Sequence, residues 1–237
     1  MPHWRDIAGA NVVCVVAHPD DAELMCYGTL RRASEAGAKV SVVIVTFGVN
    51  GVSLVDNAVG VRIAEHERVA ESASSYAGTQ IEISCLGFTD GSLTADHRLI
   101  SSVEAALAER RCDVLITHSK SANNDHQDHI AVAAAASNAA VRIPTCRMIL
   151  HGEPHAPRSV FSPNYLVEIT DLIKDKVAAM ERHQSQAGRW YLSERFTVDR
   201  AAAAGWRLAP YLAAEGRYFE AFECTLSVIA AGSDDLY

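Results

Sequence analysis

Two clusters of histidine and carboxylate residues carry the side chains best suited to metal chemistry. They occupy positions 18–21 (His-Pro-Asp-Asp) and 124–129 (Asn-Asp-His-Gln-Asp-His) of the chain. Imidazole nitrogens and carboxylate oxygens are common zinc ligands, and a catalytic zinc site uses three protein ligands and keeps one position open. Two histidines and one aspartate would supply such a site, so the clusters together predict a metal-dependent hydrolase.

The first cluster directly follows an apolar run, where a strand is expected to turn into a helix. His18 and Asp21 are spaced so that both can point toward one spot, which leaves Asp20 for another task. A simpler interpretation is that Asp20 or Asp21 caps the next helix, because Asp is common at that position. Taken alone, the first cluster does not decide between these two interpretations.

The second cluster opens an alanine-rich helical segment. His126 and His129 are three residues apart and project from the same side of a helix, so one can bind metal while the other faces a substrate. Asp128 is placed to hydrogen-bond an imidazole and hold its tautomer. Asn124 and Asp125 are good helix caps, but a cap needs one such residue rather than six consecutive polar ones.

Short β-branched runs alternate with segments of helical periodicity through the first part of the chain. We expect strands over 11–17, 40–46, 81–86 and 112–117, and helices over 22–36, 61–77, 97–110 and 128–140. This alternation predicts an α/β fold, a Rossmann-like three-layer α/β/α sandwich with a mostly parallel sheet. Because each cluster follows a strand, both should lie at the carboxyl edge of that sheet, where ligands bind.

The pattern is weaker after residue 144. We expect a strand over 164–169, a helix over 171–186 and a final strand over 220–229, while segment 151–155 is expected to be a loop. The structure of segment 190–237 is not determined by its pattern, and its aromatic residues Trp190, Tyr191 and Trp206 fit packing better than sugar stacking. With no convincing linker, we expect one catalytic domain over 1–237, with a motif-bearing core at about 11–190.

Composition limits the classes of partner and compartment. Hydrophobic residues make up 49% of the 237 residues, enough for a sizeable core. The net charge of −8 gives no general attraction for nucleic acid or anionic lipid. The six cysteines form no C-x-x-C pair, and no apolar run is long enough to suggest a membrane span. We therefore expect a soluble cytoplasmic protein; the sequence leaves homo-oligomers open.

At this point the sequence resembles a known family. Residues 17–23 (AHPDDAE) and 28–30 (GTL) resemble the first signature of the PIG-L/LmbE-like zinc-dependent N-deacetylases, and 124–129 is similar to the second. Smaller matches follow in order: Thr46-x-Gly48, Arg62-x-x-Glu65, residues 86–91 (LGFTDG) and Lys176 with residues 183–186 (HQSQ). In the commoner first signature, Glu directly follows the two aspartates. Here Ala22 intervenes, which leaves the role of Glu23 open.

The resemblance implies a metal centre and a reaction. It makes His18, Asp21 and His129 the ligands of Zn²⁺, although another divalent transition metal would suit the same donors. It also implies that the enzyme removes an N-acyl group, most often acetyl, from an amino sugar or a small molecule that contains one. Zinc would make water a nucleophile at neutral pH.

The resemblance also implies roles around the metal. Asp20 would be the general base. His126, oriented by Asp128, would stabilise the oxyanion or protonate the leaving amine. Arg62 and Asp90 would contact hydroxyl groups of the sugar or a neighbouring part of the substrate.

Other functions fit parts of the same pattern. An amidase of the same fold could act on a thiol–sugar conjugate or an acylated antibiotic intermediate. A non-catalytic metal-binding or ligand-binding module would bind zinc without needing Asp20. A nucleotide-binding protein would use the polar clusters as helix caps and bind no metal, but the sequence contains no G-x-G-x-x-G or phosphate-binding loop motif.

Overall fold

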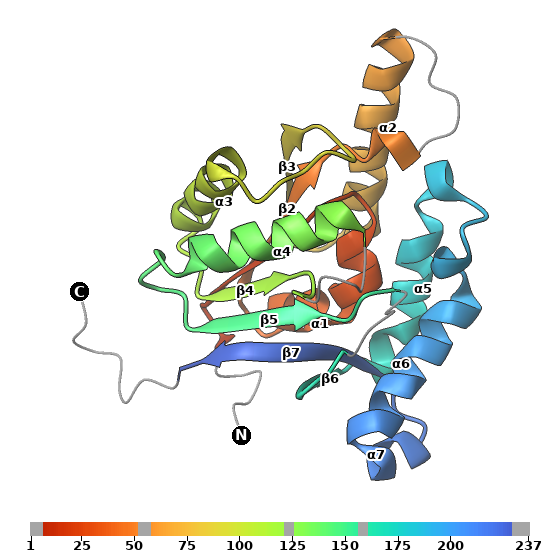
Figure 1. Cartoon of the computed structure of the whole chain (residues 1–237). Coiled ribbons are helices and arrows are strands. Elements are labelled where there is room, and N and C mark those ends of the chain that lie inside the picture. Colours follow the sequence, from red (N-terminus) through yellow and green to blue (C-terminus); the bar gives the residue numbers. More distant parts are fainter. Residues whose placement is uncertain (1–6, 52–57, 121–125, 156–160, 229–237) are drawn as a thin grey trace.

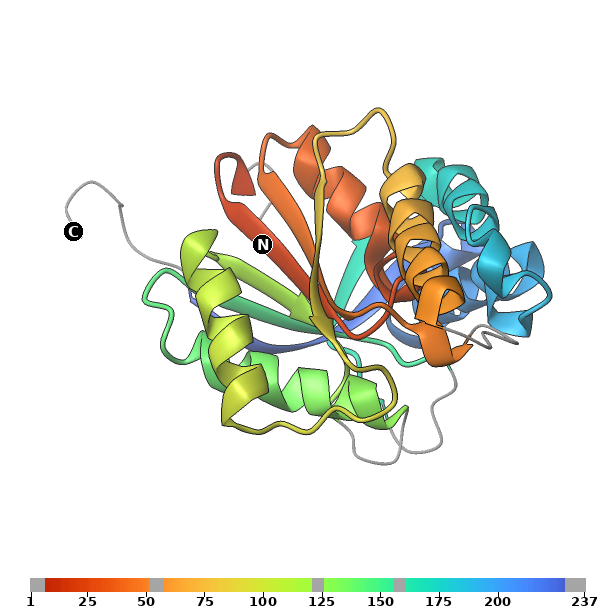
Figure 2. The same ribbon diagram turned by 90° about the horizontal axis from the view of Figure 1, so that it is seen from above.

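A computed structural model of the chain describes residues 7–51, 58–120, 126–155 and 161–228, and for residues 51 and 58–63 the main chain alone. One central sheet lies between two layers of helices (Figures 1 and 2). The predicted three-layer α/β fold is therefore confirmed. In the described part of the chain, no helix is long and apolar enough to cross a membrane.

The sheet has seven strands among the described residues, in the order β3-β2-β1-β4-β5-β7-β6. Their bounds are β1 Asn11–Val16, β2 Lys39–Thr46, β3 Glu82–Phe88, β4 Val114–Thr117, β5 Met148–Gly152, β6 Tyr165–Glu168 and β7 Phe219–Ser227. The pairings β3-β2-β1-β4-β5 are all parallel, while β7 runs antiparallel to β5 and β6. The central strands are almost wholly apolar because helices cover both of their faces.

Two helical layers bury the faces of this sheet. The helices are α1 Asp21–Glu35, α2 Ala58–Ser75, α3 His97–Glu109, α4 Gln127–Ala140, α5 Ile173–Glu181, α6 Glu194–Leu208 and the short α7 Pro210–Ala214. Residues of α3 and α4 share one apolar core with the sheet. Residues of α1, α5 and α6 share the core on the opposite face (Figure 2).

The register of the central strands brings the two predicted clusters to one edge. Strands β1 and β4 are hydrogen-bonded neighbours, with Val15 opposite Thr117 near their carboxyl ends. Just beyond this pair, the main-chain N–H of Ala17 donates to Nε2 of His118 over 2.9 Å. The turn after β1 therefore lies beside the turn after β4, as expected for adjacent parallel strands.

Helix α1, which begins at the first cluster, has a break at Cys26. A carboxylate from the last strand, β7, accepts hydrogen bonds from main-chain groups just after this break. Cys26 departs from helical geometry at φ −148° and ψ 23°. Glu220 of β7 accepts hydrogen bonds from the main-chain N–H groups of Gly28, at 3.0 Å, and Thr29, at 2.7 Å. The same carboxylate binds the buried Lys176 ammonium at 2.6 Å. Glu220 thus satisfies donors near the break in α1 and ties β7 to the helix that carries the first cluster.

The larger differences from the expected elements lie after residue 140, while before it the helix expected over 61–77 spans Ala58–Ser75. Strand β5 was not predicted, and the loop expected over 151–155 is wrong at His151 and Gly152, which belong to β5. Helix α5 ends at Glu181 rather than 186, because the chain tightens into a 3₁₀ turn over Gln184–Gln186. Helices α6 and α7 occupy the segment whose structure the pattern did not determine.

Candidate metal centre and pocket

The turn after β1 holds Asp20 in an unusual backbone conformation. Its φ is 117°, a region that residues with a side chain rarely adopt and that often marks a functional site. Asp20 is the N-terminal cap residue of α1, yet its side chain makes no capping hydrogen bond to a described residue. Helix capping, the simpler interpretation of the sequence, therefore does not account for the Asp20 carboxylate.

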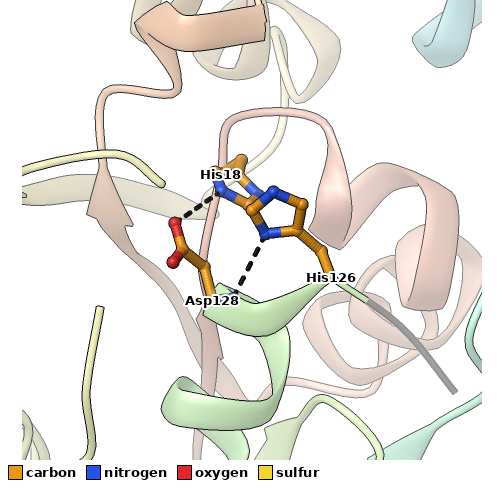
Figure 3. A group of neighbouring side chains, drawn as sticks. All are labelled: His18, His126 and Asp128. Atoms are coloured by element: carbon orange, nitrogen blue, oxygen red, sulfur yellow. Dashed lines mark hydrogen bonds and ion pairs between the residues drawn. The ribbon is translucent and has the colours of Figure 1, made fainter. Parts of the chain in front are cut away.

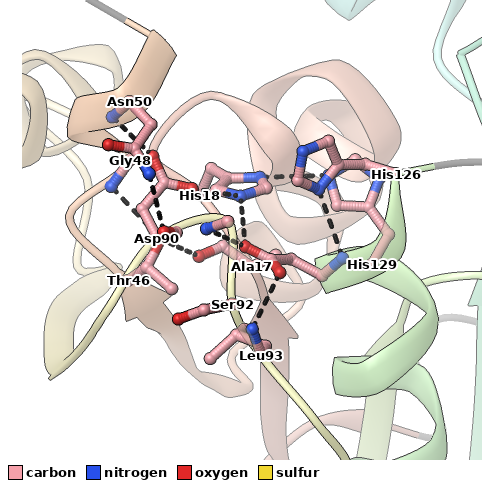
Figure 4. A network of polar contacts seen from close by, with 12 residues as sticks. Ala17, His18, Thr46, Gly48, Asn50, Asp90, Ser92, Leu93, His126 and His129 are labelled. Atoms are coloured by element: carbon pink, nitrogen blue, oxygen red, sulfur yellow. Dashed lines mark hydrogen bonds and ion pairs between the residues drawn. The ribbon is translucent and has the colours of Figure 1, made fainter.

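Three side chains from the two predicted clusters bring their donor atoms together in a compact triangle. Nδ1 of His18 lies 3.1 Å from Nε2 of His129. Oδ2 of Asp21 lies 3.3 Å from His18 Nδ1, and Oδ1 of the same carboxylate lies 3.2 Å from His129 Nε2. Donors about 2.0–2.1 Å from a tetrahedral ion would be separated by about 3.3 Å. The three side chains thus fit one divalent ion, and Figure 4 shows His18 and His129 converging from separate segments.

Carboxylates surround the other side of the His18 ring. Nε2 of His18 lies 3.2 Å from Asp90 and 3.3 Å from Asp128, and Figure 3 shows the contact with Asp128. Burial opposes protonation of His18, but these carboxylates and Asp21 hold its pKa well above the usual range. The site therefore carries surplus negative charge, which favours a bound cation.

Asp128 is anchored by main-chain hydrogen bonds. Its carboxylate accepts the N–H of Gly91 at 2.7 Å and of Leu93 at 3.0 Å while it faces His18. The sequence predicted that Asp128 would orient His126. Figure 3 shows a different relation, in which Nδ1 of His126 accepts the main-chain N–H of Asp128 at 3.2 Å. The Asp128 carboxylate instead supports the His18 ring, as a carboxylate behind a metal-binding histidine does.

A second set of donors overlaps the first. His18, His126 and Asp128 also offer ligand atoms within 4.8 Å of one another. In this set His126 is exposed and its Nδ1 accepts the N–H that opens α4. Asp21 and His129 of the first set are buried and place donors against the same nitrogen of His18. The first set therefore makes the better metal site.

Asp20 faces a pocket beside these donors and is paired with a cation. Nη2 of Arg68 lies 3.0 Å from the Asp20 carboxylate, and the guanidinium also donates to the main-chain carbonyls of Pro19 and Gly48. Burial raises the pKa of Asp20 to about 6, with Arg68 opposing the rise and the nearby Asp21 adding to it. A carboxylate with such a pKa is suited to take up a proton near neutral pH.

Arg68 is a pocket residue that the sequence did not single out. The predicted substrate contact, Arg62, belongs to helix α2. The structure describes only the main chain of this residue, so the predicted contact stays a prediction. The spacing Arg62-x-x-Glu65 recurs six residues later as Arg68-x-x-Glu71. This second copy was the available signal, because Arg68 lines the pocket and Glu71 accepts the N–H of Ser185 at 2.7 Å.

Glu23, whose role the sequence left open, is buried beneath the pocket. Its carboxylate accepts the hydroxyl of Ser72 at 2.6 Å and lies 3.6 Å from Nε2 of His183. These contacts join α1 to α2 and to the turn after α5. Glu23 therefore supports the helix that carries Asp21 and does not line the pocket.

The pocket has a volume of about 370 Å³, within the range of small-molecule sites. The predicted residues Asp20, Asp90 and His126 line it together with the metal donors. Its lining also includes residues that were not predicted as site residues, from four other segments of the chain: Asn50, Arg68, His155, Gln186, Arg189 and Tyr191. Asn124 and Asp125 of the second cluster lie outside the described residues.

One family model matches residues 13–140, more than half of the 237-residue chain, and is described as "PIG-L: GlcNAc-PI de-N-acetylase". The matched segment includes both clusters, so the resemblance noticed in the sequence is confirmed.

Individual proteins are similar to this chain in sequence or in fold. Over 188 residues the chain is 23% identical to a diacetylchitobiose deacetylase from Thermococcus kodakarensis, covering 74% of this chain and 70% of the relative. The structure of N,N'-diacetylchitobiose deacetylase from Pyrococcus horikoshii superposes with a TM-score of 0.77 at 22% identity, covering 91% of this chain and 83% of the other. The hydratase GalB from Pseudomonas putida superposes with a TM-score of 0.78 at 17% identity, covering 94% and 99%. At these identities the two structures show the fold alone.

Proposed function

The chain belongs to the PIG-L family of GlcNAc-PI de-N-acetylases, and from that premise we propose that it hydrolyses the N-acyl bond, above all N-acetyl, of an amino sugar or a small molecule containing one. The observation that carries the proposal is the donor triangle of His18, Asp21 and His129, in which the nearest polar atoms of each pair of side chains are 3.1–3.3 Å apart. It stands beside the Asp20 carboxylate in one pocket.

The metal proposed for the triangle is zinc. Two imidazoles and one carboxylate match the donor set of catalytic zinc sites, and three protein ligands leave room for water or substrate. When bound, the ion supplies Lewis acidity, which makes water a stronger nucleophile and polarises an amide carbonyl. Asp90 and Asp128 hold the His18 ring from its other nitrogen, so that Nδ1 faces the metal position.

Asp20 is the proposed general base. It accepts the proton that a water molecule loses as its oxygen bonds to the acyl carbon. The same proton is then returned to the nitrogen as the C–N bond breaks, so that acetate and the free amine leave. Arg68 keeps the carboxylate ionised near neutral pH and fixes its direction through the neighbouring carbonyls.

His126 is the proposed donor to the carbonyl oxygen. Because Nδ1 accepts a main-chain N–H, a neutral His126 ring carries its proton on Nε2. Burial, followed by the neighbouring His18 and His129, lowers the pKa of His126 and favours that neutral form. A neutral imidazole donating from Nε2 can stabilise the negative charge that develops on the oxygen.

The proposal treats residues 1–237 as one catalytic domain. Strand β7 pairs with β5 and β6 and sends Glu220 into the break in α1. The part of the chain beyond the predicted motif core therefore supports the helix that carries Asp21.

The test is acetate release by the zinc-loaded protein from N-acetylglucosamine and N,N'-diacetylchitobiose, with the new amine measured in the same samples. Asp20→Asn protein with the same metal content serves as the control. We expect both products in equal amounts from the unsubstituted protein and a large loss in the variant. No acetate from a panel of N-acyl amino sugars, together with water addition to an unsaturated acid, would favour hydratase chemistry on this fold.

A further inference from the structure

A series of aromatic rings leads outward from the candidate metal centre. The ring of His155 lies 6.2 Å from that of His129. Beyond it, Tyr191 and Trp190 lie 5.2 Å and 5.9 Å from His155. His155 and Tyr191 line the pocket, whereas Trp190 is not among the described lining residues. Trp190 is therefore the next ring beyond the pocket wall.

Trp190 is exposed but held in place. Its side chain is 55% exposed, while Tyr191 and Phe196 pack against it at 5.6 Å and 4.9 Å in edge-to-face geometry. Its neighbour Leu192 is buried in a small apolar cluster with Leu24 of α1. The turn that carries Trp190 is thus packed against α1, the helix that carries Asp21. This packing fixes the distance between Trp190 and the metal centre.

A rigid, exposed indole beside a polar pocket suits one kind of ligand. Tryptophan offers a large apolar contact area with little rotational freedom to lose. A pyranose ring has an apolar C–H face and a polar hydroxyl rim, so it can cover the indole while its hydroxyls stay hydrated. Resting on the proposed function, the pocket would hold the acylated ring, and only a larger substrate would reach Trp190.

We propose that Trp190 is a subsite for a second sugar ring, so that the preferred substrate is an N-acyl amino sugar linked to another sugar rather than a monosaccharide. Trp190 would contact the second sugar ring and would not contact the atoms that react. Its contribution should therefore appear in KM for two-ring substrates and be absent for one-ring substrates.

The kinetic test compares Trp190→Ala with Trp206→Ala, using the zinc-loaded full chain. Trp206 is a matched control, because its side chain is 58% exposed in α6 and is not among the described pocket-lining residues. For Trp190→Ala we expect KM for N,N'-diacetylchitobiose to rise about 3- to 10-fold with kcat little changed. The KM for N-acetylglucosamine should not change, and Trp206→Ala should match the unsubstituted protein with both sugars. Equal effects on both sugars, or none on either, would overturn the subsite.

A binding measurement separates this proposal from the proposed function. The chain has three tryptophans, so Trp4→Phe with Trp206→Phe leaves Trp190 as the single indole emitter. In an Asp20→Asn background, the disaccharide should shift the Trp190 emission to shorter wavelength in a saturable manner, and the monosaccharide should not. A shift with p-nitrophenyl N-acetylglucosaminide but not with the disaccharide would overturn the second sugar in favour of an aryl group. If the disaccharide shifts the emission but the unsubstituted enzyme releases no acetate, the subsite stands and the deacetylase proposal fails.

Discussion

The guanidinium of Arg68 lies 3.0 Å from the carboxylate of Asp20 and also donates to the main-chain carbonyls of Pro19, after β1, and Gly48, after β2. The contact is made to a residue whose φ is 117°. Such a conformation is unfavourable by about 1–3 kcal/mol and persists only where neighbouring contacts enforce it. A single buried cation thus sets both the direction and the charge of the proposed base.

Asp20→Asn should retain the metal and lose most turnover. The amide keeps the size of the side chain but cannot accept a proton, and loss of a general base typically lowers rate by about 100- to 10,000-fold. Metal content by elemental analysis and kcat for acetate release check the two parts separately. Loss of the metal in this variant would instead make Asp20 a ligand.

Arg68→Gln should move the acid limb of the pH–rate profile to higher pH. The proposed base acts when ionised, so activity is present above its pKa of about 6 and falls as pH drops through that value. Arg68 lowers the pKa of Asp20, and its removal therefore raises the pH at which activity is lost. The profile of kcat/KM measures the shift. Arg68→Lys keeps the charge and should shift the limb less, whereas an unmoved limb in Arg68→Gln would show that Asp20 is not the titrating base.

The sequence predicted the metal donors but not Arg68, and the reason is geometric. His18, Asp21 and His129 belong to polar clusters that follow adjacent strands, so a local pattern and one rule of parallel sheets bring them together. Arg62 and Arg68 share the same spacing to a glutamate, and positions six apart on a helix differ by about 240° around its axis. Which one faces the pocket depends on how α2 packs, which a local pattern does not encode.

The sequence raised sugar stacking for Trp190 and Tyr191 but favoured packing, and it could not place either residue near the first cluster. Trp190 and Tyr191 lie in a short 3₁₀ turn between α5 and α6, and nothing in their spacing connects them to the first cluster. Their place is set by long-range contacts, above all Leu192 against Leu24 of α1. Strand β5 was missed because only the first three of its five residues, Met148 to Leu150, are large and apolar, a run too short to show periodicity.

His129→Ala and His126→Ala should separate the two overlapping sets of donors. His129 belongs to the donor triangle, with its Nε2 3.1 Å from His18 and 3.2 Å from Asp21, so its loss should abolish tight zinc binding. His126 belongs only to the alternative set with Asp128, and its loss should leave the metal bound while lowering kcat by about 100- to 1,000-fold. Because a ligand of the folded state stabilises it, the zinc-induced rise in Tm reports binding. A rise retained in His129→Ala and lost in His126→Ala would favour the alternative set.

Glu220→Ala should destabilise the fold far more than a surface charge deletion. The carboxylate is the buried partner of Lys176 at 2.6 Å and accepts the N–H groups of Gly28 and Thr29. Removing one member of a buried ion pair leaves an uncompensated charge and typically lowers the free energy of unfolding by about 3–5 kcal/mol. Urea denaturation measures the change. Asp171→Asn, which breaks an exposed pair with Arg32, is the matched control and should lower stability by less than about 1 kcal/mol.

His151 should make the folded protein sensitive to mild acid. Nδ1 donates to the carbonyl of His118 at 2.8 Å, and Nε2 accepts the hydroxyl of Thr225 at 3.2 Å, so the buried ring is neutral. Burial lowers the pKa of His151 from 6.5 to about 4. Between these values the unfolded chain binds the proton and the folded chain does not. Stability from this residue is therefore complete above pH 6.5 and is lost as pH falls toward 4, by about 3 kcal/mol in all.

The free energy of unfolding, measured by urea denaturation from pH 7.5 to 4, tests this dependence against variants. His151→Asn keeps a side-chain N–H for the His118 carbonyl but has no group that titrates in this range, so it should lose less stability on acidification than the unsubstituted chain. The exposed His66 of α2 provides the control, and His66→Gln should follow the unsubstituted chain at every pH. If the free energy of unfolding fell equally with pH in all three proteins, protonation of His151 would not oppose folding. A buried neutral imidazole whose pKa is lowered by folding must instead reduce stability as the pH falls.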